Sequence, residues 1–141
     1  MPALAVVAER IRSTCPSFRY VAGAADFARA RDGVPASPAA YVIPLGESAG
    51  ENQFTGSSVM QRIDASIGVV IATRNATDQR GAAGVDDLDE LKVELRAALL
   101  GWAPGDDDAP LIAAGGQLVG FFDGFVWWQE EFVTAYHIRQ L

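Results

Sequence analysis

The sequence is poor in several residue types, and each scarcity excludes a class of protein. Its 141 residues include one cysteine and one histidine. The single cysteine, Cys15, excludes an intrachain disulfide and is typical of a protein from a reducing compartment. His137 has no second histidine or partner cysteine with which to bind zinc. The sequence therefore predicts no metal site, and it offers no motif for a cofactor.

Long apolar runs and excess positive charge are also missing. No charge-free run approaches 18 residues, so we expect no membrane-spanning helix. The first residues lack a basic segment and carry Glu9 and Arg10 directly after a short apolar run, which argues against a signal peptide. The net charge is −7, with 18 acidic against 11 basic residues. This balance argues against sequence-independent binding of DNA or RNA, which depends on clustered lysine and arginine.

Catalytic signatures are scarce as well. The sequence contains neither a P-loop nor a G-x-G-x-x-G fingerprint. The neighbouring acids Glu130 and Glu131 lie on a predicted strand, where successive side chains point to opposite faces. They cannot act together as an acid–base pair. We therefore predict that the protein is not an enzyme.

The clearest helix is predicted for residues 86–102. Its apolar residues recur at steps of three and four and form one face: Leu88, Leu91, Leu95, Leu99 and Trp102. Asp86 is the predicted N-cap, and Gly101 is the predicted left-handed residue that ends the helix. Val93, Ala97 and Leu100 lie nearly opposite the leucine row. They pack either against a neighbouring helix of the same chain or against another subunit.

The remaining elements follow from periodicity and from turn residues. We expect helices at 3–15 and 24–31, strands at 18–21, 41–43, 61–74, 111–113, 117–122 and 125–139, and polar loops at 45–58 and 75–85. A glycine hairpin at 114–116 and an Asp123-Gly124 turn connect the last three strands. The strand at 61–74 is unusually long, so either Gly68 marks a bend or the strand projects beyond the body.

These elements predict one domain over residues 1–141 with an α+β fold. The short connections between strands favour a mainly antiparallel sheet, and we expect helices to flank it on one face. Trp127 and Trp128 are adjacent on a strand, so one indole should lie on each face of the sheet. Both faces must be covered at that point.

Several stretches together resemble a known family. They are P-A-S-P-A-A-Y-V-I-P at 35–44, Q-R-I at 61–63, the helix that ends L-L-G-W-A-P at 99–104, and W-W-Q-E-E-F at 127–132. Their order and spacing resemble the tail terminator, or tail completion, proteins of long-tailed bacteriophages and related prophages. The resemblance extends over nearly the whole chain, although each motif alone is short.

The resemblance implies a non-enzymatic structural protein of the virion, made in the bacterial host cytoplasm. It implies a ring of identical subunits, commonly a hexamer, at the head-proximal end of the tail. This ring would cap the completed tail tube, stop its polymerisation and offer a joining surface to a head-completion protein. One alternative is another head–tail joining or tail-tube component. An alternative of a different class is a small-molecule-binding domain, which requires a pocket around Trp102, Trp127 or Trp128.

Three sets of candidate residues follow. The proposed subunit interface comprises Val93, Ala97 and Leu100. The proposed contacts with the tail tube lie on or beside the polar loops: Phe54, Arg74 and Arg80. Acids on the wall of a passage for DNA would repel the duplex, and the candidates are Asp64, Asp86, Asp87 and Glu90.

Overall fold

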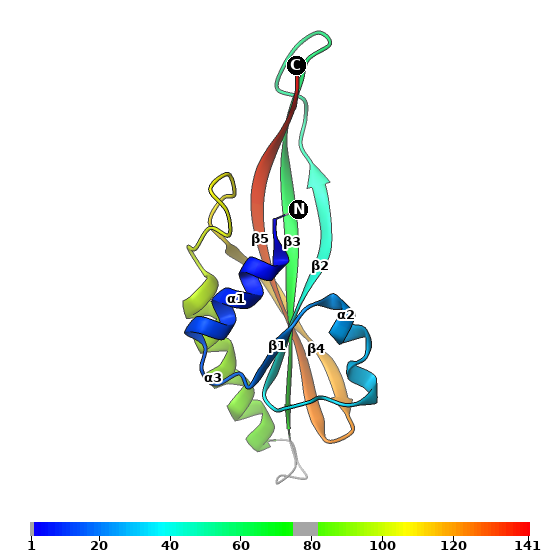
Figure 1. Cartoon of the computed structure of the whole chain (residues 1–141), viewed down its shortest axis with the longest axis vertical. Coiled ribbons are helices and arrows are strands. Elements are labelled where there is room, and N and C mark those ends of the chain that lie inside the picture. The colour runs from blue at the N-terminus through cyan, green and yellow to red at the C-terminus, as the bar shows by residue number, and fades with distance from the viewer. Residues whose placement is uncertain (1, 75–81) are drawn as a thin grey trace.

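The structure is a computed structural model that describes residues 2–74 and 82–141, without the side chains of residues 31 and 82–86. Its centre is a five-stranded sheet in the order β1-β2-β3-β5-β4 (Figure 1). The strands are β1 (Tyr20–Ala22), β2 (Ala39–Ala49), β3 (Val59–Arg74), β4 (Ile112–Phe122) and β5 (Phe125–Gln140). β1 is parallel to β2, and all other neighbours are antiparallel. This confirms the α+β fold with a mainly antiparallel sheet.

Two long helices, α1 (Leu4–Thr14) and α3 (Ala82–Leu99), cover one face of the sheet, which we call the helix face. The predicted leucine row of α3 is buried, since Leu95 and Leu99 are fully inaccessible to solvent. These leucines pack with the apolar face of α1 and with alternate residues of the central strands: Ala40, Val42, Ile67, Val69, Ile71, Val126 and Phe132. None of the described helices is long and apolar enough to cross a membrane.

A smaller helix lies on the opposite face of the sheet. α2 (Ala24–Ala28) and the 3₁₀ turn η1 (Ala30–Asp32) pack with Tyr41 and Trp127 there. The expectation of helices on one face therefore describes α1 and α3, while α2 covers the other face. The reason is that successive side chains of β2 and β5 point to opposite faces, and both sets are apolar, so each face needs a cover. We call the cluster under α1 and α3 the first core and the cluster under α2 the second core. Trp127 belongs to the second core and Trp128 packs against the first, as the tandem tryptophans predicted.

The boundaries of α3 differ from the prediction at one end. The helix begins at Ala82, four residues before Asp86, so Asp86 is not its N-cap. Alanine has the highest helix propensity, which allows residues expected in a polar loop to start the helix. At the other end Gly101 has a φ of +80° and the helix stops at Leu99. The predicted terminating glycine is confirmed.

The predicted glycine hairpin at 114–116 is wrong, because β4 is continuous. Its pairing with β5 shifts at Ala113/Gly115 and again at Leu118/Gly120. Gly115 and Gly120 have φ values of +147° and +157° at these positions. The glycines therefore absorb bulges within one strand instead of reversing the chain. The expected turn at Asp123-Gly124 is confirmed, since both residues have positive φ.

The loop expected at 45–58 is also partly wrong, because β2 continues to Ala49 and pairs with β3 as far as Ile63. Backbone pairing with β3 is sufficient there, so the strand needs no apolar pattern. The long strand predicted at 61–74 is β3, and of the two possibilities, a bend at Gly68 or a projection beyond the body, the structure shows the projection. The ends of β2, β3 and β5 extend beyond the helices with their connecting loop (Figure 1). We call residues 45–62 and 136–141 the arm, and the remainder the body.

Candidate interaction surfaces

The outer side of α3 carries an apolar stripe that no described part of the chain covers. Val93 is 66% exposed and Leu100 is 42% exposed, with Ala97 exposed between them. The neighbouring-helix explanation therefore fails for the described residues. A subunit contact is the alternative left open by the sequence.

An ion pair between the half-exposed Arg96 and a buried carboxylate fixes α3 on the sheet beside this stripe. Glu130 of β5 is 1% exposed. Its two carboxylate oxygens accept hydrogen bonds from Nε and Nη2 of Arg96, each at 2.9 Å. These bonds to Glu130 raise the pKa of Arg96 further above its ordinary value. Trp128 donates a third hydrogen bond from Nε1 to Glu130 Oε1 at 2.8 Å. The carboxylate is thus fully satisfied, which a buried charge requires.

The same network reaches the edge of the sheet. Lys92 Nζ lies 4.1 Å from the centre of the Trp128 ring, a cation–π contact. Gly116 of β4 lies directly beside the network. A Cβ placed there would approach Glu130 Oε1 and Trp128 Cζ2 to 2.9 Å each. Residue 116 must therefore lack a side chain for the ion pair to keep its geometry.

β4 itself is an uncovered edge strand rich in apolar residues. Its sequence, IAAGGQLVGFF, contains no charged residue and no proline. The exposed fractions of its large side chains are high: Ile112 59%, Leu118 50%, Val119 46%, Phe121 54% and Phe122 55%. Edge strands of soluble monomers commonly carry lysine, proline or short length to prevent pairing with another chain. β4 has none of these three, although two bulges interrupt it. Its length and its exposed apolar residues are typical of a strand that pairs in an assembly.

A groove lies between α2 and the β4–β5 turn on the opposite face. Its lining is mostly apolar: Phe27, Ala28, Ala30, Gly33, Val34, Val119, Phe122, Asp123, Phe125 and Trp127. Trp127 Nε1 and the Tyr41 hydroxyl are buried without a hydrogen-bond partner among the described residues. Burial raises the pKa of Tyr41 above its ordinary value, with a smaller effect from Tyr20. With a single carboxylate, the groove lacks the convergent polar groups typical of a small-molecule site.

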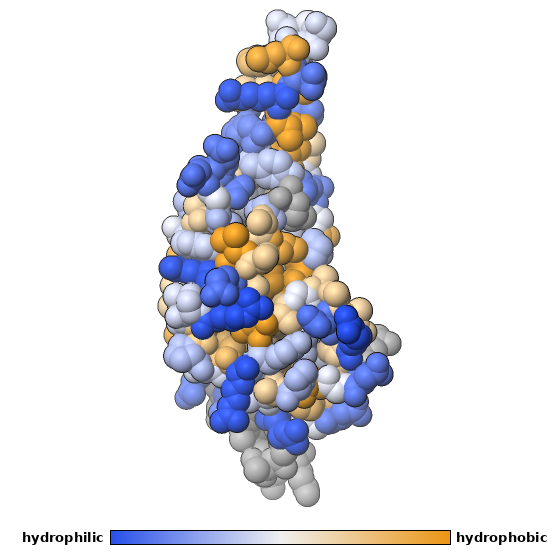
Figure 2. Space-filling model, viewed as in Figure 1, coloured by the Kyte–Doolittle hydropathy of each residue, from blue (hydrophilic) through white to orange (hydrophobic). Residues whose placement is uncertain are grey.

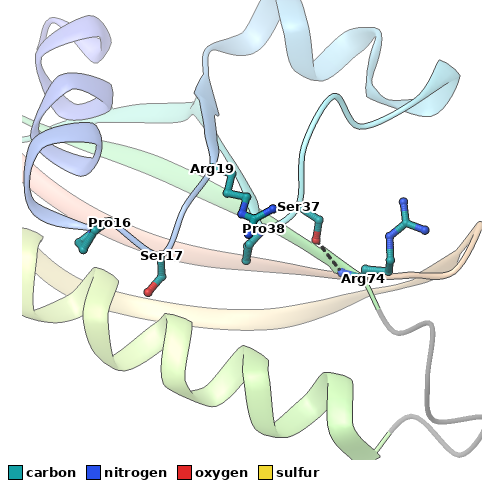
Figure 3. Close-up of a pocket in the computed structure, with 6 residues that line it drawn as sticks. All are labelled: Pro16, Ser17, Arg19, Ser37, Pro38 and Arg74. Carbon is teal, nitrogen blue, oxygen red and sulfur yellow. Dashed lines mark hydrogen bonds between the residues drawn. The ribbon is translucent and has the colours of Figure 1, made fainter.

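A second, polar pocket lies at the end of the body away from the arm (Figure 3). It is lined by Pro16, Ser17, Arg19, Ser37, Pro38 and Arg74. The backbone N–H of Arg74 donates to Ser37 Oγ at 2.9 Å, which ties the end of β3 to the preceding loop. The guanidinium of Arg74 lies 5.2 Å from the centre of the Phe125 ring. It turns away from Arg19 in Figure 3, so the two cations do not converge on one ligand.

The structure separates the predicted tube contacts. Phe54 lies in the loop of the arm and is 40% exposed. Arg74 lies at the far end of the 16-residue strand β3, which spans about 50 Å at about 3.3 Å per residue. Arg80 falls outside the described residues. Phe54 and Arg74 therefore cannot belong to one small contact site.

The predicted wall acids also lie apart. Asp64 is on β3 next to the arm and forms an ion pair with Arg62 at 3.0 Å. Asp87 and Glu90 are exposed on α3, close to the other end of the molecule. The side chain of Asp86 lies outside the described part of the structure. Any single acidic wall must run along the length of the subunit to include both groups.

The described residues do not form a catalytic site. Residues 46–50, G-E-S-A-G, have the G-x-S-x-G spacing of a hydrolase nucleophile. They lie within β2, whereas such a serine requires a sharp strand-to-helix turn. Within the described part of the chain Ser48 has no hydrogen bond to His137 or Asp64. No group of three or more His, Cys, Asp or Glu in residues 2–74 and 82–141 could hold a metal ion.

Comparison with known protein families shows which family the chain belongs to. The model of the phage tail terminator protein family matches residues 2–140. The chain belongs to the phage tail terminator family. Proteins of this family are structural and non-enzymatic, so membership makes the chain a phage tail component that associates with the tail tube. No curated protein sequence matches it. The resemblance found in the sequence is thereby confirmed at the level of the family.

Proposed function

We propose that the chain forms a ring, most simply a hexamer, on the end of a completed tail tube. The ring stops further polymerisation of the tube and presents a surface to a head-completion protein. The family match over residues 2–140 carries this proposal. The hexameric number is an expectation from the resemblance.

The exposed surfaces support assembly. A soluble monomer rarely exposes large contiguous apolar patches, and such patches mark interaction sites. Among the described residues, exposed large apolar side chains gather on the stripe of α3, on the edge strand β4 and in the arm, while Val6 on α1 is exposed singly. The arm residues are Leu45, Phe54, Ile138 and Leu141. A ring needs two different surfaces on each subunit, because head-to-tail contacts join unlike patches. The tube then needs a third surface.

The separation of the apolar surfaces suggests how they are used. We propose that α3 and the sheet edges contact neighbouring subunits, and that Phe54 in the projecting arm contacts a component along the tail axis. Arg74, at the other end of β3, then belongs to a contact on the opposite side of the ring. One end thus meets the tube and the other end meets the head-completion protein.

The charge supports a passage that does not bind DNA. Six chains of net charge −7 would form a strongly acidic ring. We place Asp64, Asp87 and Glu90 among the acids on its inner wall, with Asp86 beside them in the sequence. We expect no binding of duplex DNA by the assembled ring in an anisotropy titration at about 150 mM salt. Micromolar binding with a steep salt dependence would instead indicate a connector that holds DNA.

Negative-stain imaging of cognate tail tubes, with and without the protein, tests the proposal. We expect a ring at one tube end and no further growth when more tube protein is added. Filaments made by the protein alone would identify it as a tube component instead. Tubes that continue to lengthen with the protein present would contradict termination.

A further inference from the structure

β4 offers a row of unpaired backbone groups on one edge of the sheet, interrupted at its two bulges. It pairs with β5 on its inner side, and no described strand lies on its outer side. An unpaired edge of this kind binds most readily to another β-strand, because only a strand matches its alternating donors and acceptors. The chemistry of the edge therefore specifies the kind of partner.

The same chain has a second open edge on the other side of the sheet. β1 pairs with β2 only from Ala39 to Tyr41. The rest of β2, Val42–Ala49, has β3 on its inner side and no described strand on its outer side. Within it, Pro44 has no N–H to donate and a bulge follows at Pro44/Gly46, so the other residues must provide the donors. Each subunit thus has one open edge at either side of its sheet.

The directions of the two edges match. β2 is antiparallel to β3, β3 to β5, and β5 to β4, so β2 and β4 run in opposite directions. Copies arranged around a common axis in one orientation would place β4 of one copy antiparallel to β2 of the next. The heights overlap over part of the two edges. Ile112 pairs with Val133, Val133 with Ser66, and Ser66 with Gly46, so Ile112 and Gly46 lie level across the sheet. The same comparison places Gly116 level with Val42, so residues 112–116 of β4 lie level with residues 42–46 of β2.

We propose that residues 112–116 of β4 in each subunit pair with residues 42–46 of its neighbour, so that one sheet continues from subunit to subunit around the ring. The inference rests on the proposed ring and adds the contact that closes it. The partner of β4 is a second copy of this chain, because the matching edge of opposite direction belongs to the chain itself.

Site-specific cross-linking between two variants tests this contact. Ile112→Cys on β4 and Ser48→Cys on β2 both lie on the face of the sheet opposite α1 and α3, and both positions are exposed. Cys15 can stay, because it is fully buried and burial raises the pKa of its thiol, which keeps the thiol protonated. The variants are mixed in equal amounts with cognate tail tubes and treated with a short bis-maleimide. Rings are counted on the same sample by negative stain.

The expected result is a cross-linked dimer in the mixture and in neither variant alone, since the contact joins unlike edges. A mixture of Ile112→Cys with Ala5→Cys, an exposed position on α1, is the matched control and should give none. A dimer from Ile112→Cys alone would overturn the proposal in favour of β4–β4 pairing. Rings without cross-links in the mixture would overturn the shared sheet and leave the terminator function standing. Absence of both rings and cross-links would overturn both.

Discussion

The body and the arm share the strands β2, β3 and β5 but differ in what covers them. In the body, β3 is buried on both faces from Ile67 to Thr73, between α1 and α3 on one side and α2 on the other. In the arm, β3 from Val59 to Arg62 is partly or fully exposed, and the facing residues of β5 are exposed too. Figure 2 shows the arm as a narrow projection from the wider body. The body is complete within one chain, whereas the arm has no core of its own.

Ion pairs repeat this difference. Glu130 in the body is buried and held by both Arg96 and Trp128. Arg62 and Asp64, where the arm begins, form a pair whose side chains are 56% and 49% exposed. Glu130 cannot lose Arg96, whose side chain is 43% exposed, without leaving a buried carboxylate short of its cation, while water replaces either partner of the exposed pair. The body therefore depends on this internal contact, whereas the arm does not depend on its own ion pair.

The largest expected effect breaks assembly and leaves the body intact. Val93→Asp places a charge on the exposed stripe of α3, where a subunit contact would bury it without a partner. We expect loss of rings on tube ends, with a cooperative melt close to that of the wild type. The matched control is Val6→Asp on α1, where the wild-type side chain is 41% exposed. A Val93→Asp chain that loses its cooperative melt would instead show that the stripe is part of the core.

Next in size is the loss of the ion pair with Glu130. Arg96→Ala should lower the free energy of unfolding by about 1–3 kcal/mol, because Glu130 stays buried without its cation while the half-exposed position of Arg96 admits water. Arg62→Ala, the control near the arm, should change it by about 0–1 kcal/mol. Urea denaturation followed by far-UV circular dichroism measures both. Equal losses in the two variants would remove the distinction between body and arm.

The smallest effect concerns a hydrogen bond across the arm. The hydroxyl of Tyr136 donates to the Glu47 carboxylate, which lowers the pKa of Glu47 and raises the pKa of Tyr136. Because the folded pKa of Glu47 lies below its unfolded value, the stabilisation is present above the unfolded pKa. It is lost as the pH falls through the folded pKa. Tyr136→Phe should therefore raise the pKa of Glu47 towards its ordinary value.

A carboxyl-detected NMR titration of Glu47 measures this shift. Tyr20→Phe serves as control, since Tyr20 lies in the second core and should leave the pKa of Glu47 unchanged. A Glu47 pKa that is the same in Tyr136→Phe and in the wild type would mean that the bond does not order the arm.

Local patterns predicted most of the body. The leucine row of α3, its stop at Gly101 and the turn at Asp123-Gly124 depend on nearby residues, so the sequence contains the information for them. The continuity of β4 did not follow from its pattern, because glycines mark a bulge and a hairpin equally well. The length of β2 was missed since its outer half is held by backbone pairing alone.

The exposed apolar surfaces were predictable only in part. Val93 and Leu100 could be placed away from the leucine row by helical periodicity, and the structure shows them exposed, while their role in a subunit contact stays a prediction. β4 was missed, since an apolar edge strand and a buried strand have the same composition. The pair Arg96–Glu130 was missed because its members are 34 residues apart, and only the packing of α3 on β5 joins them. The one local indication of this pair was Glu130 itself, an acid that interrupts the apolar face of β5.

Amide hydrogen exchange of the free protein and of the protein on tail tubes tests the central claim most directly. In the free protein, we predict strong protection in β3 from Ile67 to Thr73 and rapid exchange in the arm loop, 50–58, and at the outward amides of β4. On tube ends, the amides of β4 and of residues 42–46 should become protected together, with the arm loop also slowed and the central part of β3 unchanged. Unchanged exchange in both β4 and the arm on rings that have formed would contradict the account.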